Sequence, residues 1–512
     1  MKVDLFEEYI RITENLGINS KDSTWWYTFL ANRDRYGSLL QTWMYKIQSE
    51  SIDPIEIEKI IPSYLFILKK TTLALLQIIF IILKSKMKKQ FFQETVDIIL
   101  IAPIHTPMIV NNSNDYFDTY FGDLVSYYLK QNLSVLIVGP EIQNKKGKNS
   151  NLYFSKQLSI KSIVDFFFIQ NIYSLLISFF KIIFFSDPPK LLYESSIKNI
   201  KNLILADFRN SFANILICSL YEISFINLFK RYPNSKIYHT FENSTWEKSI
   251  QISLKKNEDN RNTTGYLHCA VLDSHLKLFM TEEDFQNRPM PDQIICTGLN
   301  AKKALLCQGA YPNDKVKDGI ALREKYLTEN FHEKEAQNQY ECIVLLEGLP
   351  SMLEFLKVIL DSIDEINKKI LVRCHPTISL DQNYFRSIKS HKNFFKIEDS
   401  VEKNLFIDLT KSNIVLYKGT SAALYAGFMQ KKLIRFKDSW WRSDNPLERS
   451  PIPIHEFQNS KELFNLLMNS SNLYSRENLI DIQTYIKDYI TIPSSENIEK
   501  NFLTILPQYK PN

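Results

Sequence analysis

Two polar segments contain the side chains that proteins use to bind phosphate. One directly follows the apolar run 370–372 and the other follows the run 414–417. The groups that they supply are Arg373, His375, Lys418, Gly419, Thr420 and Ser421. Proline at 376 restrains His375 to an extended conformation, so its ring stays at the strand end. We expect these groups to hold the phosphate of a nucleotide, although each segment alone also fits a capped loop histidine or an ordinary helix N-cap.

A third candidate, Glu347, ends the apolar run 342–346. Its carboxylate can accept hydrogen bonds from the ribose or base of a nucleotide. The alternative is that it caps the helix that follows. The residue types leave both interpretations open.

The best candidate for acid–base chemistry is Glu242, which follows the predicted strand 236–241. A carboxylate at a strand end can remove a proton from an acceptor hydroxyl, or act as a nucleophile on a sugar. Glu247 lies nearby, but Ser244 or Thr245 before it makes a helix start, so Glu242 is preferred. His268 ends the next predicted strand and can reach the same cleft, unless it is a core histidine.

These side chains must be positioned by two units in which strands and helices alternate. The first unit has predicted strands at 96–103, 133–140, 236–241, 265–272 and 293–298, with helices at 117–130, 212–229 and 249–256. The second has predicted strands at 342–346, 370–372, 414–417 and 433–436. Alternation of this kind predicts parallel sheets, in which ligands bind at the carboxyl ends of the strands. The predicted fold class is therefore α/β, with two Rossmann-type domains facing a cleft.

The predicted domain boundaries follow changes in composition. Residues 1–90 form a helical segment, 91–325 the first Rossmann-like domain with an apolar helical insertion at 160–186, 340–450 the second, and 451–512 C-terminal helices. The polar segment 328–339 is the predicted linker. We expect Trp25, Trp26 and Tyr27 to be core, with a membrane interface as the alternative.

The overall composition argues against several classes of function. The chain has 512 residues, 45% apolar and 23% charged, and a net charge of +5 that gives no reason to expect nucleic acid as a partner. Its six cysteines are scattered without metal-ligand spacing. GxSxG, Walker A, GxGxxG, HExxH and a strand-end DxD pair are all missing from the sequence, so we expect no metal and no cofactor. The N-terminus does not have the pattern of a signal peptide.

Basic residues surround an apolar segment, 71–83, that is too short to span a bilayer. They are Lys69, Lys70, Lys84, Lys86, Lys88 and Lys89. The segment 163–185 is long enough to span, but polar residues interrupt it, so we expect an interfacial or buried helix. The prediction is a cytoplasmic protein, peripheral on the inner membrane.

At the level of motifs the chain resembles GT-B glycosyltransferases that use CMP-activated acidic sugars, such as bacterial sialyltransferases and Kdo transferases. The two α/β units carry that resemblance together with His375-Pro376 and Gly419-Thr420-Ser421. Further segments resemble surface carbohydrate biosynthesis proteins related to the Kdo transferases: Trp25-Trp26, Phe241-Glu242 to Trp246-Glu247, Gly265-Tyr266-Leu267-His268, and Gly309-Ala310-Tyr311-Pro312 before Leu322-Arg323.

The resemblance implies a metal-independent transferase of capsule or lipopolysaccharide biosynthesis. A sugar such as Kdo or sialic acid would move from a CMP donor to a lipid-linked or glycan acceptor. His375, Thr420 and Ser421 would hold the CMP phosphate, and Glu242 would act on the acceptor or the sugar. The chain departs from the family in lacking an Asp/Glu-Asp/Glu-Gly motif in its first unit, which leaves retaining and inverting chemistry both open.

Two alternatives remain at this stage. A CDP-glycerol-type phosphotransferase of teichoic-acid-like polymers has similar His-Pro and Ser motifs. A non-catalytic partner in polysaccharide assembly would keep the fold without the reaction.

Overall fold

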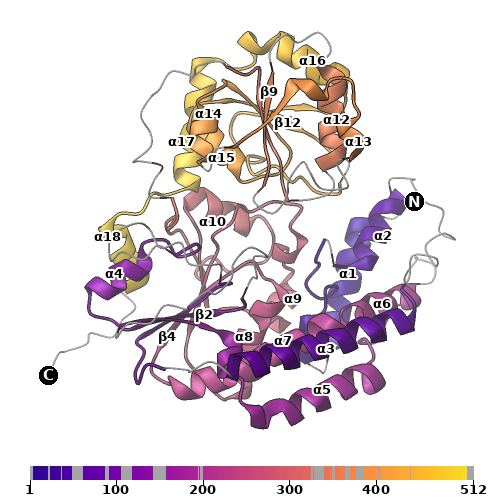
Figure 1. Ribbon diagram of the computed structural model, residues 1–512, viewed down its shortest axis with the longest axis vertical. Helices are drawn as coiled ribbons and strands as arrows, with labels where there is room; N and C mark the ends of the chain where they lie inside the picture. Colours follow the sequence, from indigo (N-terminus) through magenta and orange to yellow (C-terminus); the bar gives the residue numbers. More distant parts are fainter. Residues whose placement is uncertain are drawn as a thin grey trace.

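The computed structural model shows two parallel β-sheets, one in each half of the chain, with helices packed around them (Figure 1). The residues that the structure describes are 4–20, 23–35, 37–48, 62–86, 92–104, 118–141, 157–193, 195, 200–324, 327, 339–348, 352–363, 369–375, 386–401, 404–438 and 440–503. Residues 328–338 of the predicted linker 328–339 lie outside them, as do Pro376, Lys88 and Lys89. The predicted fold class, α/β with two Rossmann-type domains and extra helices at both ends, is confirmed.

In the described residues the first sheet has the strand order β3-β2-β1-β4-β5-β6-β7, and all of its pairs are parallel. Every residue of β1 and β2 is buried, as expected for strands covered on both faces. The strands are β1 (Ile98–Ile101), β2 (Val135–Gly139), β3 (Leu158–Ser162), β4 (Lys236–Thr240), β5 (Thr263–Tyr266), β6 (Gln293–Ile295) and β7 (Val316–Lys317).

The helices of the first domain pack against this sheet and against one another. α7 and α8 form the most extensive helix pair, and both bury apolar residues. The helices are α4 (Leu124–Lys130), α6 (Ile200–Asn210), α7 (Phe212–Arg231), α8 (Thr245–Lys256), α9 (Glu282–Asn287) and α10 (Leu299–Leu306).

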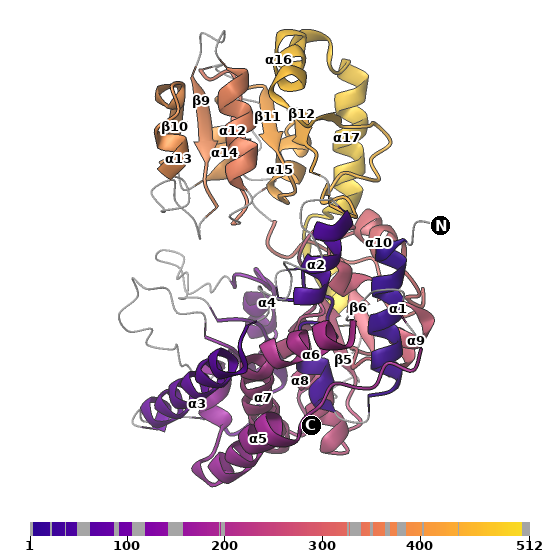
Figure 2. The same cartoon turned by 90° about the vertical axis from the view of Figure 1, so that its right-hand side faces the viewer.

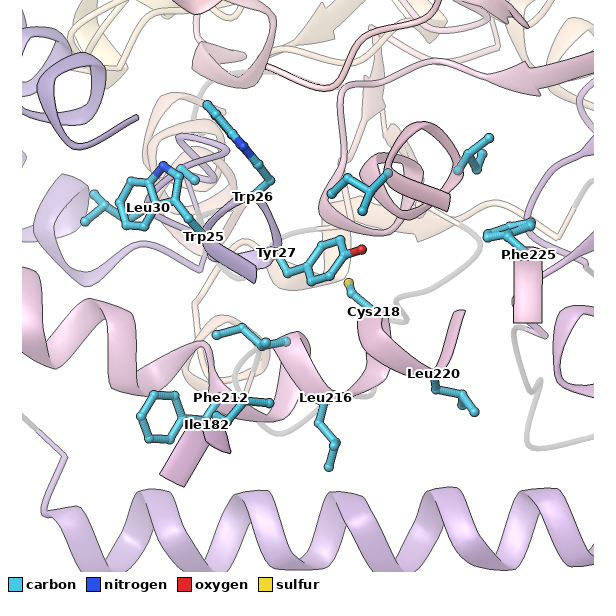
Figure 3. Packing of buried hydrophobic residues seen from close by; sticks show 14 of the residues in the cluster. Trp25, Trp26, Tyr27, Leu30, Ile182, Phe212, Leu216, Cys218, Leu220 and Phe225 are labelled. Atoms are coloured by element: carbon cyan, nitrogen blue, oxygen red, sulfur yellow. The ribbon is translucent and has the colours of Figure 1, made fainter. Parts of the chain in front are cut away.

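The N-terminal segment is part of the same core. α1 (Leu5–Ile18) packs on α9, and α2 (Leu39–Gln48) packs on α1 and α6. Between them, the 3₁₀ helix η1 (Ser23–Tyr27) lies over α7 and α8, and Figure 3 shows Tyr27 directed toward Cys218. Trp25, Trp26 and Tyr27 are buried, so the core interpretation is confirmed.

Two apolar helices lie side by side at the far end of this domain from the second sheet, as both views show (Figures 1 and 2). α3 (Tyr64–Lys86) is 23 residues long, whereas the sequence predicted a short apolar segment at 71–83. α5 (Ile172–Phe185) follows two 3₁₀ turns, η3 (Ile163–Phe166) and η4 (Ile169–Asn171). The predicted insertion at 160–186 begins inside β3, because Lys161 and Ser162 pair with β2.

The second sheet has the order β10-β9-β8-β11-β12-β13 in the described residues and is also parallel. Its strands are β8 (Ile343–Leu345), β9 (Ile370–Arg373), β10 (Ile397–Asp399), β11 (Ile414–Tyr417), β12 (Lys432–Phe436) and β13 (His455–Phe457). The helices around it are α12 (Met352–Ser362), α13 (Arg386–Lys389), α14 (Leu405–Leu409), α15 (Ala422–Phe428) and α16 (Ser460–Met468).

The C-terminal helices join the two domains. α17 (Arg476–Tyr489) packs on α15 of the second domain and on α10 of the first. The chain then returns to the first sheet through α18 (Ser495–Ile498) and a π-helical turn, Glu499–Leu503. There the carbonyl of Phe502 accepts a hydrogen bond of 2.8 Å from the hydroxyl of Tyr238 in β4. The tail therefore fixes the second domain to the first.

Candidate functional site

The carboxyl edge of the first sheet carries a carboxylate, a histidine and a lysine in mutual contact. Glu242 follows β4, and its Oε1 lies 3.2 Å from Nε2 of His268, which follows β5. Its Oε2 accepts a hydrogen bond of 2.9 Å from Nζ of Lys277. The Lys277 ammonium holds the pKa of the Glu242 carboxyl well below its usual range, and the carboxylate in turn raises the pKa of Lys277. Since the Glu242 side chain is 34% exposed, this ionised group faces solvent.

His268 is arranged to accept a proton. Its Nδ1 is buried and has no hydrogen-bond partner among the described residues. Burial lowers the pKa of His268, and Glu242 opposes that shift only in part. The imidazole is therefore neutral near pH 7, with Nε2 facing the carboxylate and a lone pair left on Nδ1. The ring of Tyr120 packs edge-on against it, with the centroids 4.9 Å apart.

Glu247 has a structural part in this arrangement. Its carboxylate accepts hydrogen bonds from the backbone N–H groups of Glu242, at 3.0 Å, and of Ser244, at 2.9 Å. With Ser244 it forms the capping box that begins α8. Burial raises the pKa of Glu247 to about 7. Glu247 therefore holds the backbone of the turn that carries Glu242, and the role of Glu242 as the reactive carboxylate stays a prediction.

The carboxyl edge of the second sheet brings Glu347 next to Gly419. A Cβ atom on Gly419 would lie 2.8 Å from Oε1 of Glu347 and 2.8 Å from the carbonyl oxygen of Asp444. Only glycine fits without a shift of the neighbouring backbone. Burial raises the pKa of Glu347 to about 7, and the nearby carboxylate of Asp444 adds to the increase.

Thr420, Ser421 and His375 lie at the same edge. Ser421 and His375 are exposed, and Thr420 is half-buried. Oγ1 of Thr420 accepts a hydrogen bond of 3.2 Å from the N–H of Ala422, at the start of α15. This leaves the Thr420 O–H as a donor. α15 has seven residues, so the hydroxyls rather than a long helix dipole are the relevant groups.

Two of the predicted phosphate ligands are held by carboxylates instead of pointing into open space. Nη1 of Arg373 lies 2.6 Å from Oδ2 of Asp408, and Nζ of Lys418 lies 2.9 Å from Oδ2 of Asp438. Lys418 is only 3% exposed. Both cations are therefore neutralised, and their contacts fix the ends of β9 and β11.

Contacts between loops bring the two edges together. The N–H of Ser274, after β5, donates to the carbonyl of Ser443, after β12, at 2.9 Å. Arg35 of the N-terminal segment lies 3.5 Å from Asp438 and stacks on the ring of Trp440 at 4.1 Å. The hydroxyl of Tyr425 in α15 donates to Glu324, after β7, at 2.5 Å. Residues from the carboxyl ends of both sheets thus form the domain contact.

Lys277 and Arg35 are the site residues that sequence reasoning missed. Neither belongs to a motif, and Lys277 lies eleven positions beyond the end of β5 in a segment without periodicity. No signal in the sequence identifies them. In the part of the chain that the structure describes, there is no group of three or more His, Cys, Asp or Glu side chains that could hold a metal ion.

Comparison with known proteins leaves the family unassigned. No protein-family model matches the chain. A curated relative, the DNA-directed RNA polymerase subunit β′ of Oedogonium cardiacum, is 24% identical over 322 residues, which cover 58% of this chain. The chain spans only 16% of the length of that relative. A match of this extent does not transfer the activity of that protein.

Several solved structures have a similar course of the chain. The structure of S. aureus MnaA with UDP is 12% identical, with 79% of this chain and 94% of that chain covered and a TM-score of 0.42. TarM is 9% identical, with 80% and 98% covered and a TM-score of 0.43. Anabaena HepE, in complex with UDP and glucose, is 8% identical, with 80% and 100% covered and a TM-score of 0.43. With TM-scores below 0.5, these similarities supply no evidence for a function.

Proposed function

We propose that this protein is a glycosyltransferase of bacterial surface polysaccharide biosynthesis. It would move a sugar from a nucleotide donor, held at the carboxyl edge of the second sheet, to an acceptor at the edge of the first. The observation that carries the proposal is the Glu242–His268 pair. It places a buried, neutral imidazole nitrogen, which has no hydrogen-bond partner among the described residues, at a sheet edge that contacts the domain carrying Thr420 and Ser421.

In the proposed reaction His268 is the general base. Its Nδ1, which is buried in the free protein, becomes accessible when the acceptor binds and takes the proton of the acceptor hydroxyl, while the acceptor oxygen forms a bond to the anomeric carbon of the donor sugar. The bond from that carbon to the phosphate oxygen breaks, and its electron pair leaves with the phosphate. Glu242 stabilises the imidazolium that forms. A single displacement of this kind inverts the anomeric configuration.

The departing phosphate would be bound by the hydroxyls of Thr420 and Ser421 and by the ring of His375. Gly419 allows the phosphate to approach the backbone, while Arg373 and Lys418 hold the strand ends in place through Asp408 and Asp438. Hydrogen-bond donors that are already oriented stabilise developing charge without reorganisation. We therefore propose a reaction that needs no metal, in line with the missing acidic pair at the strand ends of the sequence.

A CMP-activated acidic sugar is the donor that we propose. Arg323 follows β7, its side chain is 29% exposed, and one of its N–H groups donates to the carbonyl of His268 at 3.0 Å. A guanidinium at this position can pair with the carboxylate of Kdo or sialic acid next to the general base. The choice of CMP as the nucleotide rests on the motif resemblance to transferases that use CMP-activated sugars.

The cytoplasmic face of the inner membrane is the proposed location. Exposed apolar side chains cover one side of α3 and α5, and exposed lysines lie among them. The apolar residues include Leu65, Phe66, Leu76, Phe80, Tyr173, Phe184 and Phe185, and the lysines are Lys69, Lys70, Lys84, Lys181 and Lys190. By length and composition, α3 and α7 of the described chain could cross a bilayer. Because α3 packs on α7 along one face, we propose that it lies in the interface and does not cross.

Calorimetry with CMP tests the donor site. Wild type should bind CMP, and the double variant His375→Ala, Ser421→Ala should lose binding at least tenfold. The double variant Ser390→Ala, His391→Ala is the matched control, since it removes the same two groups from the surface of the same domain. Unchanged CMP binding in the first variant would overturn the site assignment. If the protein turns over CDP-glycerol and does not turn over CMP-Kdo or CMP-sialic acid, the proposed activity is wrong and the protein is a phosphotransferase.

A further inference from the structure

A cavity of about 640 Å³ lies between α3 and the carboxyl ends of β2 and β3, and none of the proposed donor-site or acid–base residues lines it. One wall is the apolar face of α3, formed by Leu73, Leu76 and Phe80. The opposite side contains Glu141, directly beyond the end of β2. The cavity therefore joins an apolar wall to the edge of the sheet where chemistry is proposed.

The apolar wall of the cavity is continuous with the exposed surface of α3. Leu76 and Phe80 are 58% and 66% exposed, although both line the cavity. Ile67, Thr71, Leu75, Ile78 and Ile82 form the opposite, buried face of the same helix. An apolar chain lying on the exposed face can pass from the proposed membrane surface into the cavity along Leu76 and Phe80.

The polar side of the cavity suits a head group with hydroxyls. Glu141 is an exposed carboxylate that accepts hydrogen bonds, Gln77 both donates and accepts, and Lys84 donates. Opposite charges on Lys84 and Glu141 leave no strong preference for a charged ligand. Asp165 also lines the cavity, but its carboxylate accepts a hydrogen bond of 3.2 Å from the N–H of Ser162, the N-cap residue of η3.

The cavity lies within reach of the general base. In the first sheet β1 and β4 separate β2 from β5, and neighbouring strands are about 4.8 Å apart. The end of β2, with Glu141, is therefore roughly 14 Å from the end of β5, which His268 follows. A short oligosaccharide spans that distance.

We propose that this cavity binds the acceptor, and that the acceptor is a glycolipid. Its apolar chain lies along Leu73, Leu76 and Phe80, its first sugar contacts Gln77, Lys84 and Glu141, and its terminal hydroxyl reaches His268. This inference rests on the proposed transferase function and adds the class of acceptor and the route by which the acceptor enters. A free glycan without an apolar chain would leave the α3 wall unused.

Photolabelling with a dodecyl glucoside that carries a diazirine in its chain, below its micelle concentration and without membranes, tests the cavity. Peptide mass spectrometry should place the label on 73–84 of α3. The variant Leu76→Ser, Phe80→Ser should lose this labelling at least tenfold. The matched control is Ile177→Ser, Phe184→Ser on α5, since Phe184 is 65% exposed and lines no part of the cavity. Both variants should weaken binding to anionic vesicles to a similar degree.

A second measurement tests the polar end. Unlabelled dodecyl glucoside should compete with the label at least fivefold better than dodecanol, and Glu141→Ala should abolish that difference. Labelling spread equally over α3 and α5, or equal losses in both serine variants, would overturn the acceptor cavity and leave a general apolar surface. CMP binding is measured separately. If the protein binds CMP but α3 is not labelled, only the acceptor cavity is overturned. If α3 is labelled but the protein does not bind CMP, the transferase assignment is overturned.

Discussion

Replacing Glu242 by glutamine tests the general-base mechanism most directly. In the structure the Glu242 carboxylate lies 3.2 Å from Nε2 of His268, so it stabilises the imidazolium that forms when Nδ1 takes a proton. At an effective dielectric constant of 20, two unit charges at this distance interact by about 5 kcal/mol. Solvent at the exposed carboxylate and the opposing charge of Lys277 reduce this to about 3 kcal/mol, a loss of kcat on the order of 10²-fold.

The assay is transfer from the CMP-sugar at saturating donor, with CMP affinity measured on the same preparation. kcat should fall about a hundredfold, while CMP affinity stays within twofold of wild type. Since Glu242 raises the pKa of His268, the variant should also move the acid limb of its kcat/KM profile to lower pH. Glu258→Gln, an exposed carboxylate of the same domain, is the control. A kcat within threefold of wild type, or an unchanged acid limb, would refute the pairing of Glu242 with His268.

Two further predictions concern the second domain. Gly419→Ala should weaken CMP binding at least tenfold in calorimetry, because the new methyl group would lie 2.8 Å from Glu347 and from the Asp444 backbone. The melting temperature of the variant should show that it is folded. Unchanged CMP affinity would contradict a close approach of the phosphate to Gly419. Glu347 has a folded pKa of about 7, against an ordinary value of 4.5, so the folded state binds more protons in this range and stability is lost as pH rises from about 4.5 to 7. Denaturant titrations give the free energy of unfolding of Glu347→Gln and of wild type at each pH. The value for the variant minus the value for wild type should increase by about 3 kcal/mol between pH 4 and pH 8. A difference that stays constant would show that the Glu347 carboxyl is not desolvated.

The sequence determined the strands that carry the site. Ile370 to Val372 and Ile414 to Tyr417 are short apolar runs that end at polar residues, and such runs have few alternatives to a buried parallel strand. The segment from Lys236 to Phe241 contains three polar residues, but its β-branched and aromatic side chains also favour a strand. Because parallel strands align their carboxyl ends, the position of Glu242, His268, Glu347 and Ser421 at sheet edges followed from the pattern alone.

Short edge strands escaped the sequence reasoning. β10 (Ile397–Asp399) and β13 (His455–Phe457) have three residues each and contain charged or polar side chains. The apolar periodicity of three residues cannot be distinguished from a loop, so only pairing with β9 and β12 defines them. β13 thereby adds to the second sheet a segment that the sequence assigned to the C-terminal helices.

Tertiary structure alone decided which side chains are engaged. The sequence presents Lys418 and Arg373 as cations at strand ends, and the fold places Asp438 and Asp408 against them. Lys277 reaches Glu242 from 35 positions away. Ion pairs between distant residues leave no periodic trace in a sequence, because they depend on how loops from different strands converge. The sequence thus supplied the reactive groups and the edges that carry them, and the packing of the two domains determined their charges and partners.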